Sequence, residues 1–359
     1  MIASQPVVVI SHFPSPYQVE LFNEVEAQRP GWLFVYYLHR TASERRWAAA
    51  AMGHQHGFIN ASPEARDRVN SALFVVFNYY NDARVARLMR ARAASGLPWC
   101  FWAEPPGYRY PTLARLVRFE RLRPLRRSTQ PIWGIGGWAV QAYQREFGPL
   151  HSYVNLPYYS NLSRFKAGQP ALSDNQFTFL FSGSLIRRKG ADLLARAFRD
   201  LAAQLPTVRL TIMGVGHLDV SLRRTLQPCA ERVTFLGFKD WADLPEAYQK
   251  AHTLCVPSRH DGWGLVVPEG LAAGLPVIAS DRTGAALDLV RPGGNGWLVE
   301  AGNVDSLSNA MRQAATQSEA RWTQMSAEAR SSVSDHSLTN GAGRFIRAVD
   351  SALAGEVVS

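Results

Sequence analysis

The stretch PSRHDGWGLVVPEGLAAGLPVIASD, residues 257–281, decides the fold more than any other part of this sequence. It follows a short apolar run, passes through a loop with Gly262 and Gly264, and continues into a short helix expected to begin at Pro268. Proline is favoured in the first turn of a helix. Gly274 is expected to cap the end of the helix, and a second apolar run follows it. The stretch therefore predicts strand, loop, helix and strand, the repeating unit of a parallel sheet.

Short apolar runs of this kind recur along the whole chain, separated by stretches of helical length. This alternation predicts βα repeats and parallel sheets in both halves, with helices expected, for example, over residues 191–204 and 243–250. The expected strands are 7–10, 32–38, 73–77, 99–103 and 132–135 in the first half, and 178–182, 208–213, 233–236, 253–256, 276–279 and 297–299 in the second.

The chain is long enough for two domains. Its 359 residues, 47% hydrophobic and 19% charged, are typical of globular protein and exceed an ordinary single core. A connection is expected over residues 155–170, which hold two prolines and several polar residues. We therefore expect an N-terminal domain over 1–165 and a C-terminal domain over 171–340.

No run approaches the roughly 20 apolar residues that a membrane-spanning helix needs. The first apolar run, residues 7–10, is too short for a signal-peptide core. The three cysteines, Cys100, Cys229 and Cys255, are scattered and form no CxxC pair. This pattern favours a reducing, cytoplasmic setting with the cysteines packed in cores, and disfavours disulfides or a structural zinc site.

Positive charge is confined to the first half of the chain. Residues 1–170 contain 20 Arg and Lys against 10 Asp and Glu, whereas residues 171–359 contain 19 of each, so the net charge of +10 belongs to the first half. This concentration of positive charge indicates that the first half binds an anionic partner. Nucleic acid, acidic lipid headgroups and phosphorylated acceptors are candidates.

Two further glycine-containing runs follow expected strands in the second half. In FSGSLIRRKGADLL, residues 181–194, a strand ends at Gly183 and the cations Arg187, Arg188 and Lys189 lie just before a helix. Cations beside a helix N-terminus suit a diphosphate, whose charge grows as the attached group leaves. The run IMGVG, which contains Gly214, is weak evidence by itself.

An acidic pair accompanies these cations. Asp261 and Glu269 are separated by seven residues in the opening stretch, with glycines between them that allow the backbone to approach a ligand closely. Two carboxylates in such a loop suit a sugar nucleotide, because each accepts hydrogen bonds from neighbouring hydroxyl groups. Structural roles compete with this interpretation: helix caps for the two acids and a solvated surface for the cations.

Taken in this order and spacing, the three runs resemble the retaining glycosyltransferases of family 4, which have the GT-B fold. The matching positions are Gly183, the pair Lys189 and Gly190, and the acids Asp261 and Glu269. The departures are Ser184, where the family often has Arg, and Asp261, where it usually has Glu.

The resemblance covers residues 177–300 and implies an α/β GT-B fold. Its two Rossmann-like, doubly wound domains would face each other across a cleft, with the sugar donor on the C-terminal side and the acceptor on the N-terminal side. The C-terminal helix, residues 341–359, would cross back to the first domain.

The family pattern also implies roles for individual residues. Lys189, helped by Arg188, would hold the donor diphosphate, Asp261 would contact the transferred sugar, and Glu269 would bind the ribose. Backbone amides of the glycine loop would hold sugar hydroxyls and phosphate oxygens. The donor-binding positions so implied are Gly183, Arg187, Arg188, Lys189, Gly214, Gly262, Trp263, Gly264, Leu265, Val266 and Glu269.

In the first half the resemblance is thin. His12 and Tyr17, in the loop SHFPSPYQVELF, are expected on the acceptor side of the cleft, although His12 also suits an ordinary loop histidine. Glu104 lies where many relatives have a histidine near the donor sugar, so it joins Asp261 and Lys189 as a candidate catalytic residue.

The resemblance implies a retaining, metal-independent hexosyltransferase that needs no cofactor beyond its nucleotide-sugar substrate. The leaving diphosphate would accept the acceptor's proton, and the protein would position substrates and stabilise charge. No Asp-x-Asp pair is present at the expected site to hold a divalent ion. The expected setting is bacterial surface polysaccharide biosynthesis, with a glycan or lipid-linked acceptor.

An arginine-rich stretch in the first half, ended by Pro124, is interleaved with apolar residues and resembles an interfacial amphipathic helix. It predicts peripheral contact with an anionic membrane surface. An ordinary surface helix is the alternative, because Arg outnumbers Lys 35 to 4 throughout the chain. The arginines of the stretch are Arg109, Arg115, Arg118, Arg121, Arg123, Arg126 and Arg127.

Two other classes of function compete with sugar transfer. A nucleic-acid-binding protein is suggested by the net charge, but no recognisable nucleic-acid module is present and the charge lies away from the best motif. Another GT-B activity, such as a sugar-nucleotide epimerase or a phosphorylase, is the second alternative.

Overall fold

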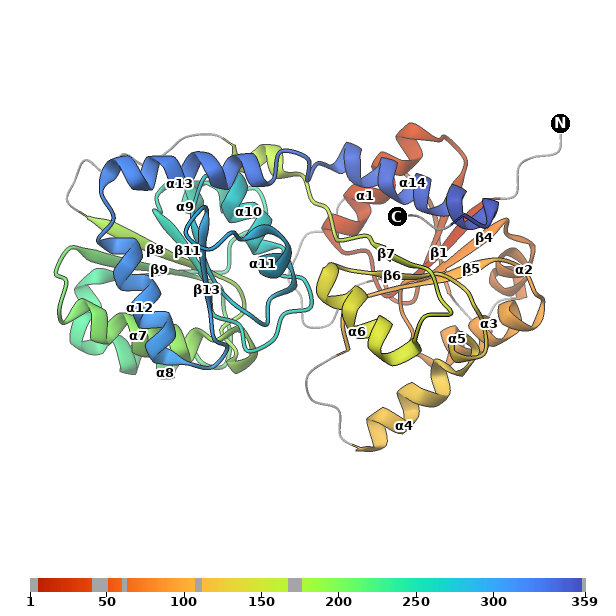
Figure 1. Ribbon diagram of the computed structural model, residues 1–359, viewed down its shortest axis with the longest axis horizontal. Coiled ribbons are helices and arrows are strands. Elements are labelled where there is room, and N and C mark those ends of the chain that lie inside the picture. The colour runs from red at the N-terminus through yellow and green to blue at the C-terminus, as the bar shows by residue number, and fades with distance from the viewer. Residues whose placement is uncertain (1–5, 41–50, 60–62, 107–111, 167–175, 357–359) are drawn as a thin grey trace. The chain divides into compact units, whose positions relative to one another are not determined.

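The computed structural model describes residues 6–40, 51–59, 63–106, 112–166 and 176–356, and these form two compact units (Figure 1). The first unit is Met1–Asn161 together with Ser337–Ser359, and the second is Leu162–His336. The chain therefore leaves the first unit within the connection proposed from sequence and returns to it for the last helix. The first unit's main segment ends four residues before the expected 165, and the second unit begins nine residues before the expected 171 and ends four residues before the expected 340.

The first unit is built on a seven-stranded parallel sheet in the order β3-β2-β1-β4-β5-β6-β7. Its elements are β1 (Val7–Ser11), α1 (Pro16–Gln28), β2 (Leu33–Tyr37), β3 (Gln55–Phe58), α2 (Pro63–Ser71), β4 (Phe74–Phe77), α3 (Ala83–Ala94), β5 (Trp99–Ala103), α4 (Thr112–Arg121), α5 (Arg123–Arg126), β6 (Ile132–Gly134), α6 (Gly137–Phe147), β7 (Tyr153–Asn155) and α14 (Leu338–Ala354).

The second unit is built on a six-stranded parallel sheet in the order β10-β9-β8-β11-β12-β13. Its elements are η1 (Leu162–Phe165), β8 (Phe177–Ser182), η3 (Arg187–Lys189), α7 (Ala191–Ala202), β9 (Val208–Met213), α8 (Asp219–Leu226), η4 (Gln227–Arg232), β10 (Val233–Gly237), α9 (Leu244–Gln249), β11 (Thr253–Val256), α10 (Val266–Ala272), β12 (Val277–Ser280), α11 (Gly284–Leu289), β13 (Gly296–Val299), α12 (Val304–Ala315) and α13 (Glu319–Ser332).

All eleven strands expected from apolar runs are present, and two further strands were missed. Both missed strands, β3 and β7, lie at the edges of the first sheet, where they are only partly buried and need no continuous apolar run. The helix expected to start at Pro268 begins two residues earlier, because α10 starts at Val266. The two doubly wound Rossmann-like units are therefore confirmed.

The last helix, α14, packs against α1 in the first unit (Figure 1). Its Phe345 is fully buried and meets the rings of Phe22, Trp102 and Trp133. Burying such an aromatic side chain contributes roughly 2–3 kcal/mol, which is enough to hold a terminal helix in place. Ser337 caps the start of this helix, because its hydroxyl accepts a hydrogen bond from the amide of Asn340.

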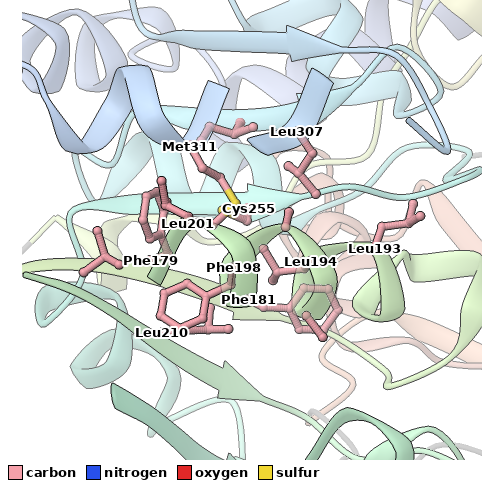
Figure 2. Packing of buried hydrophobic residues seen from close by; sticks show 14 of the residues in the cluster. Phe179, Phe181, Leu193, Leu194, Phe198, Leu201, Leu210, Cys255, Leu307 and Met311 are labelled. Carbon is pink, nitrogen blue, oxygen red and sulfur yellow. The ribbon is translucent and has the colours of Figure 1, made fainter. Parts of the chain in front are cut away.

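The core of the second unit lies between the sheet and helices α7 and α12. Figure 2 shows Leu307 and Met311 of α12 packed over Phe198 of α7, with Cys255 of β11 beside them. All three cysteines of the chain are buried thiols, as expected for core packing. Among the described residues, no helix combines the length and the apolar character needed to cross a membrane.

Two arginines of the arginine-rich stretch form ion pairs within the first unit. Arg118 forms a bidentate pair with Glu146 on α6, at 2.6 and 2.7 Å, and Arg126 contacts the same carboxylate at 2.5 Å. These two arginines therefore attach α4 and α5 to α6, and their charges are paired within the unit. Arg109 lies outside the described residues.

A buried histidine in the first unit makes its stability depend on pH. The ring of His54 lies between the hydroxyl of Tyr37, 3.0 Å from Nε2, and the amide oxygen of Asn23, 2.7 Å from Nδ1. The oxygen of Asn23 only accepts, so Nδ1 carries the proton and Nε2 accepts from Tyr37. Burial lowers the pKa of His54 to about 4, and the nearby His56 acts in the same direction.

We therefore expect the first unit to lose stability as pH falls from 7 to 5. The unfolded chain takes up a proton near pH 6.5, whereas the folded chain does not until about pH 4, so acid favours the unfolded state by roughly 2 kcal/mol. Urea unfolding at both pH values measures this difference. A His54→Gln variant should show a flatter pH dependence, and an identical dependence in both proteins would contradict the assignment.

Candidate functional site

The second sheet reverses its strand order between β8 and β11. From β8 the chain adds β9 and β10 on one side and β11, β12 and β13 on the other. Loops that follow the strands on either side of such a switch point diverge and leave a crevice outside the carboxyl ends of the strands. The cation run follows β8 and the acidic loop follows β11, so the fold brings together the two motifs found in the sequence.

Lys189 and Asp261 meet at this switch point. The ammonium nitrogen of Lys189 lies 2.5 Å from Oδ2 of Asp261, and a guanidinium nitrogen of Arg188 lies 3.8 Å from Oδ1. The Asp261 side chain is 11% exposed and that of Lys189 is 21% exposed, so the pair is largely shielded from water. A lysine ammonium has three N–H donors, and two remain for other acceptors once one is directed at Asp261.

Arg259 links the loop after β8 to the loop after β11 through hydrogen bonds and an ion pair. The amide of Arg259 donates to the carbonyl of Arg188 at 2.8 Å, and its guanidinium donates to the carbonyl of Arg187 at 2.6 Å. The same guanidinium forms a bidentate pair with Asp192 in the first turn of α7, both bonds at 2.7 Å. Arg188 in turn donates to the carbonyl of His260 at 3.0 Å. The loops are thus fixed before any ligand arrives.

Two glycines permit the close approach of these loops. Gly190 has φ of +74°, and a Cβ at this position would lie 1.9 Å from the carbonyl oxygen of Pro257. Gly214 has φ of +138°, and a Cβ there would lie 1.9 Å from the carbonyl oxygen of Gly183. Only glycine fits both the backbone angle and the space, so the ends of β8, β9 and β11 are held together at this edge.

The start of α10 presents backbone donors beside the acid pair. In the described part of the chain, the amides of Trp263, Gly264, Leu265 and Val266 donate to no acceptor. A Cβ built on Gly264 would lie 3.3 Å from Oδ2 of Asp261, which places this loop against the carboxylate. The Trp263 side chain is buried and stacks on the ring of His336, with centroids 5.9 Å apart.

Glu269 is held by a tyrosine on a neighbouring helix. The hydroxyl of Tyr248 donates to Oε2 of Glu269 at 3.0 Å, and both residues are buried. Burial and the adjacent carboxylate raise the pKa of Tyr248 well above its usual value, so the tyrosine keeps its proton and acts as the donor. Ser182, at the end of β8, also hydrogen-bonds this hydroxyl.

The histidine beside the acid pair is neutral near pH 7. Burial lowers the pKa of His260, and the cations Arg188 and Lys189 act in the same direction, whereas Asp261 opposes them. Arg187 is exposed and forms no ion pair with a described residue. Arg188, Lys189 and Arg282 thus place positive charge near His260, and Asp261 is a carboxylate facing Arg188 and Lys189.

The first unit has its own switch point, between β1 and β4. His12, after β1, stacks on Tyr79, after β4, with ring centroids 4.2 Å apart and planes at 4°. Asn78, the residue before Tyr79, accepts a hydrogen bond from the side chain of Gln18 at 2.6 Å. Tyr17, near the start of α1, packs against Tyr158 with ring centroids 4.7 Å apart. The two residues predicted for an acceptor side thus lie at the carboxyl edge of this sheet.

Glu104 follows β5 at the same edge and has an exposed side chain. Its carbonyl accepts a hydrogen bond from Tyr143 at 2.6 Å, and its carboxylate acts electrostatically on Tyr158. Glu104 therefore shares the surroundings of Tyr17 in the first unit, and its catalytic role stays a prediction.

The described residues contain no group of three or more His, Cys, Asp or Glu side chains placed to hold a metal ion.

Several residues of the second site were missed in the sequence. Arg259 and Asp192 form a pair across 67 positions, and Tyr248 reaches Glu269 across 21. No local spacing signals such contacts, because they depend on which strands become neighbours in the sheet.

A comparison with known protein families finds a match over the second unit. Residues 163–331, which span almost all of the second unit, match the family model for "Glycosyl transferases group 1". The match lies over the unit whose motifs resembled such an enzyme.

Part of the chain is similar in sequence to two curated mannosyltransferases. The chain is 26% identical over 227 residues to the GDP-mannose-dependent monoacylated alpha-(1-6)-phosphatidylinositol monomannoside mannosyltransferase of Corynebacterium glutamicum, covering 58% of this chain and 56% of that protein. It is 32% identical over 176 residues to the phosphatidyl-myo-inositol mannosyltransferase of Mycobacterium leprae, covering 48% of this chain and 46% of that protein. The match thus spans about half the length of these relatives.

Solved structures resemble the whole chain. Anabaena HepE in complex with UDP superposes with a TM-score of 0.77 and 16% identity over 96% of this chain and 100% of that one. Sucrose-phosphate synthase from Thermosynechococcus elongatus gives a TM-score of 0.73 and 20% identity over 98% and 100%. At these identities the likeness establishes the fold, which is GT-B.

Proposed function

We propose that this protein is a retaining glycosyltransferase that moves a hexose-type sugar from a nucleoside diphosphate sugar to a glycan or lipid-linked acceptor. One observation carries the proposal: Lys189 and Asp261 form a shielded pair at the switch point of the second sheet, next to the start of α10. A cation, a carboxylate and a row of backbone amides suit a sugar attached to a pyrophosphate. The family match of this unit supports the same chemistry.

In the proposed reaction the bond between the sugar's anomeric carbon and the diphosphate oxygen breaks, and a bond forms to an acceptor hydroxyl oxygen. The hydroxyl proton passes to the leaving diphosphate. Lys189 and Arg188 stabilise the negative charge that grows on the diphosphate, while Asp261 orients the sugar through its hydroxyls. The reaction then proceeds on one face of the sugar, which retains its configuration. Metal-independent catalysis is part of this proposal.

Glu269 fits the nucleoside end of the donor. Its carboxylate is fixed by Tyr248 and lies one turn into α10, beyond the amides that would receive the phosphates. A fixed carboxylate accepts two hydrogen bonds from vicinal hydroxyls, which only the ribose offers at this end of the molecule. The acceptor would bind at the carboxyl edge of the first sheet, near His12, Tyr17 and Glu104.

The test is binding and turnover of nucleotide sugars. One nucleoside diphosphate from a panel of UDP, GDP, ADP and dTDP should raise the melting temperature by about 5 °C at saturating concentration. Its sugar conjugate should be hydrolysed slowly without acceptor, and NMR of the first-formed sugar should show the donor's anomeric configuration. Absence of binding by every nucleoside diphosphate would refute the proposal, and release of the inverted anomer would refute retention.

We expect Tyr248→Phe to raise KM for the donor about tenfold and to leave kcat within a factor of two. The substitution removes one hydrogen bond that orients Glu269, a loss of roughly 1–1.5 kcal/mol. Ribose contacts are the same in the bound donor and in the transition state, so the effect falls on KM. The phenyl ring keeps the contact with Phe165, whose centroid lies 5.0 Å away. A fall in kcat at unchanged KM would contradict a positioning role.

A further inference from the structure

The glycine loop before α10, residues 262–265, depends on one side chain for its anchoring. Trp263 lies between Gly262 and Gly264, which have no side chains that could fix the backbone, and Gly264 adopts a φ of +89°. Trp263 is 1% exposed, and its carbonyl accepts a hydrogen bond from the amide of Ala285 at 2.7 Å. The backbone amides of this loop therefore keep their places only as long as the indole ring of Trp263 does.

The imidazole of His336 holds this indole ring. The two rings stack with their centroids 5.9 Å apart and their planes at 20°. The indole nitrogen of Trp263 is buried and has no hydrogen-bond partner among the described residues, so packing, and not a hydrogen bond, fixes the orientation of the ring. His336 is itself 8% exposed, and its amide donates to the carbonyl of Val333 at 3.1 Å. A buried ring with a fixed backbone thus supports the glycine loop.

The same segment of chain fixes the other end of α10. Helices α13 and α10 lie side by side (Figure 1). At the end of α10, the hydroxyl of Ser326 donates to the carbonyl of Gly274 at 2.6 Å, and the guanidinium of Arg330 donates to the carbonyl of Ala273 at 3.1 Å. His336 lies just after α13 and contacts the loop before α10. This part of the chain therefore holds both ends of the helix that carries the second acid of the donor motif.

We propose that His336 is a positioning residue of the donor site: by stacking on Trp263 it holds the backbone amides of the glycine loop beside the carboxylate of Asp261. The inference rests on the proposed function, because these amides matter for turnover only where a sugar diphosphate binds. A Cβ on Gly264 would lie 3.3 Å from this carboxylate, so the loop borders the group that would orient the sugar. A displaced loop would misplace donors at the reacting end of the substrate.

Loss of the stack should affect turnover more than binding of the nucleotide. Lys189 and Glu269, which would hold the diphosphate and the ribose, have contacts of their own with Asp261 and Tyr248. His336→Ala should therefore lower kcat about tenfold, because misplaced groups at the reacting centre slow the reaction, and should change the Kd of the nucleoside diphosphate by less than about a factor of three. The probes are the one of UDP, GDP, ADP and dTDP that binds the parent, and the glucose, galactose or mannose conjugate that the parent hydrolyses.

A conservative variant and hydrogen–deuterium exchange of the ligand-free protein test the stack itself. His336→Phe keeps an aromatic ring and should restore kcat to within about a factor of two. The amide of Val267 donates to the carbonyl of Gly264 at 3.0 Å, and that of Ala285 to the carbonyl of Trp263 at 2.7 Å. Both amides should exchange faster in His336→Ala, because the loop that carries their acceptors opens more often, and at the parental rate in His336→Phe. Unchanged exchange in His336→Ala, or an equal loss of kcat in both variants, would overturn the proposal.

A buried histidine elsewhere in the same unit is the matched control. His252 is 6% exposed and stacks on Phe177, with centroids 5.2 Å apart and planes at 25°, but it precedes β11 at the opposite edge of the sheet. His252→Ala should lower the melting temperature and leave kcat within about a factor of two. An equal fall in kcat in His252→Ala would overturn the proposal, as would an unchanged kcat in His336→Ala. A parent that binds none of the four nucleoside diphosphates would instead refute the proposed function, and exchange would still decide whether His336 fixes the loop.

Discussion

Replacing Lys189 by Ala should lower kcat/KM for the donor by about two to three orders of magnitude, the usual effect of removing a group that stabilises charge in the transition state. The ammonium lies at the switch point of the second sheet, 2.5 Å from Asp261, and is largely shielded from water. Charge on a leaving diphosphate is best stabilised by a fixed cation in such surroundings. Steady-state kinetics with saturating acceptor measure the effect. Lys189→Arg should recover part of the loss.

The loss of Lys189 also leaves the Asp261 carboxylate without its closest partner, and a fall in stability could mimic a loss of function. The double variant Lys189→Ala/Asp261→Asn removes both charges and should regain the melting temperature of the parent without regaining activity. Lys250→Ala is the matched control, because Lys250 pairs with Glu246 at 2.6 Å on an exposed face of the same unit. Full activity in Lys189→Ala, or an equal loss in Lys250→Ala, would contradict the assignment.

The second large effect concerns stability alone. Arg92→Met should destabilise the first unit by about 3–5 kcal/mol, because it removes a buried charged group that completes a hydrogen-bond network. Arg92 is 0% exposed, and burial lowers the pKa of its guanidinium to about 10, so the group stays charged at neutral pH. It donates to five carbonyl groups, at distances between 2.8 and 3.4 Å: those of Val69, Asn70, Ala72, Leu73 and Pro98.

These carbonyls belong to the last turn of α2 and to the loops before β4 and β5, so one side chain joins three segments. A methionine fills a similar volume but leaves the buried oxygens without donors. Urea unfolding followed by tryptophan fluorescence should show the first unit's transition at lower denaturant. Arg87→Met, on the exposed face of the same helix, should change stability by less than about 0.5 kcal/mol. Nucleotide affinity should stay unchanged in both, and coincident unfolding curves would refute the role given to Arg92.

The donor-side motifs could be recognised in the sequence because each is local. Gly183, Lys189 and Gly190 fall within one strand–turn–helix segment, and Asp261 and Glu269 within another. Their residue types and spacing follow from the backbone geometry of single loops. That Lys189 touches Asp261 does not follow from spacing, because 72 residues separate them and the contact depends on β8 and β11 becoming neighbours.

The contacts of the arginine-rich stretch could not be recognised in the sequence. Its spacing suggested a single cationic helix, but two of its arginines bind Glu146, which lies 28 residues from Arg118 and 20 from Arg126. Arg123 and Arg127 of the same stretch line a hollow of about 500 Å³ together with Arg90 from α3. Helical periodicity shows which residues share a face, but not which face packs against the neighbouring helix.

The sequence alone therefore determined the two parallel α/β units, their buried strands and the residues of the donor motif, since apolar periodicity and glycine turns act over a few residues. Tertiary structure alone decided the edge strands β3 and β7, the Tyr248–Glu269 hydrogen bond and the ion pair between Arg259 and Asp192. These features join segments distant along the chain, and their energy depends on burial and on partners that exist only once the sheets have formed.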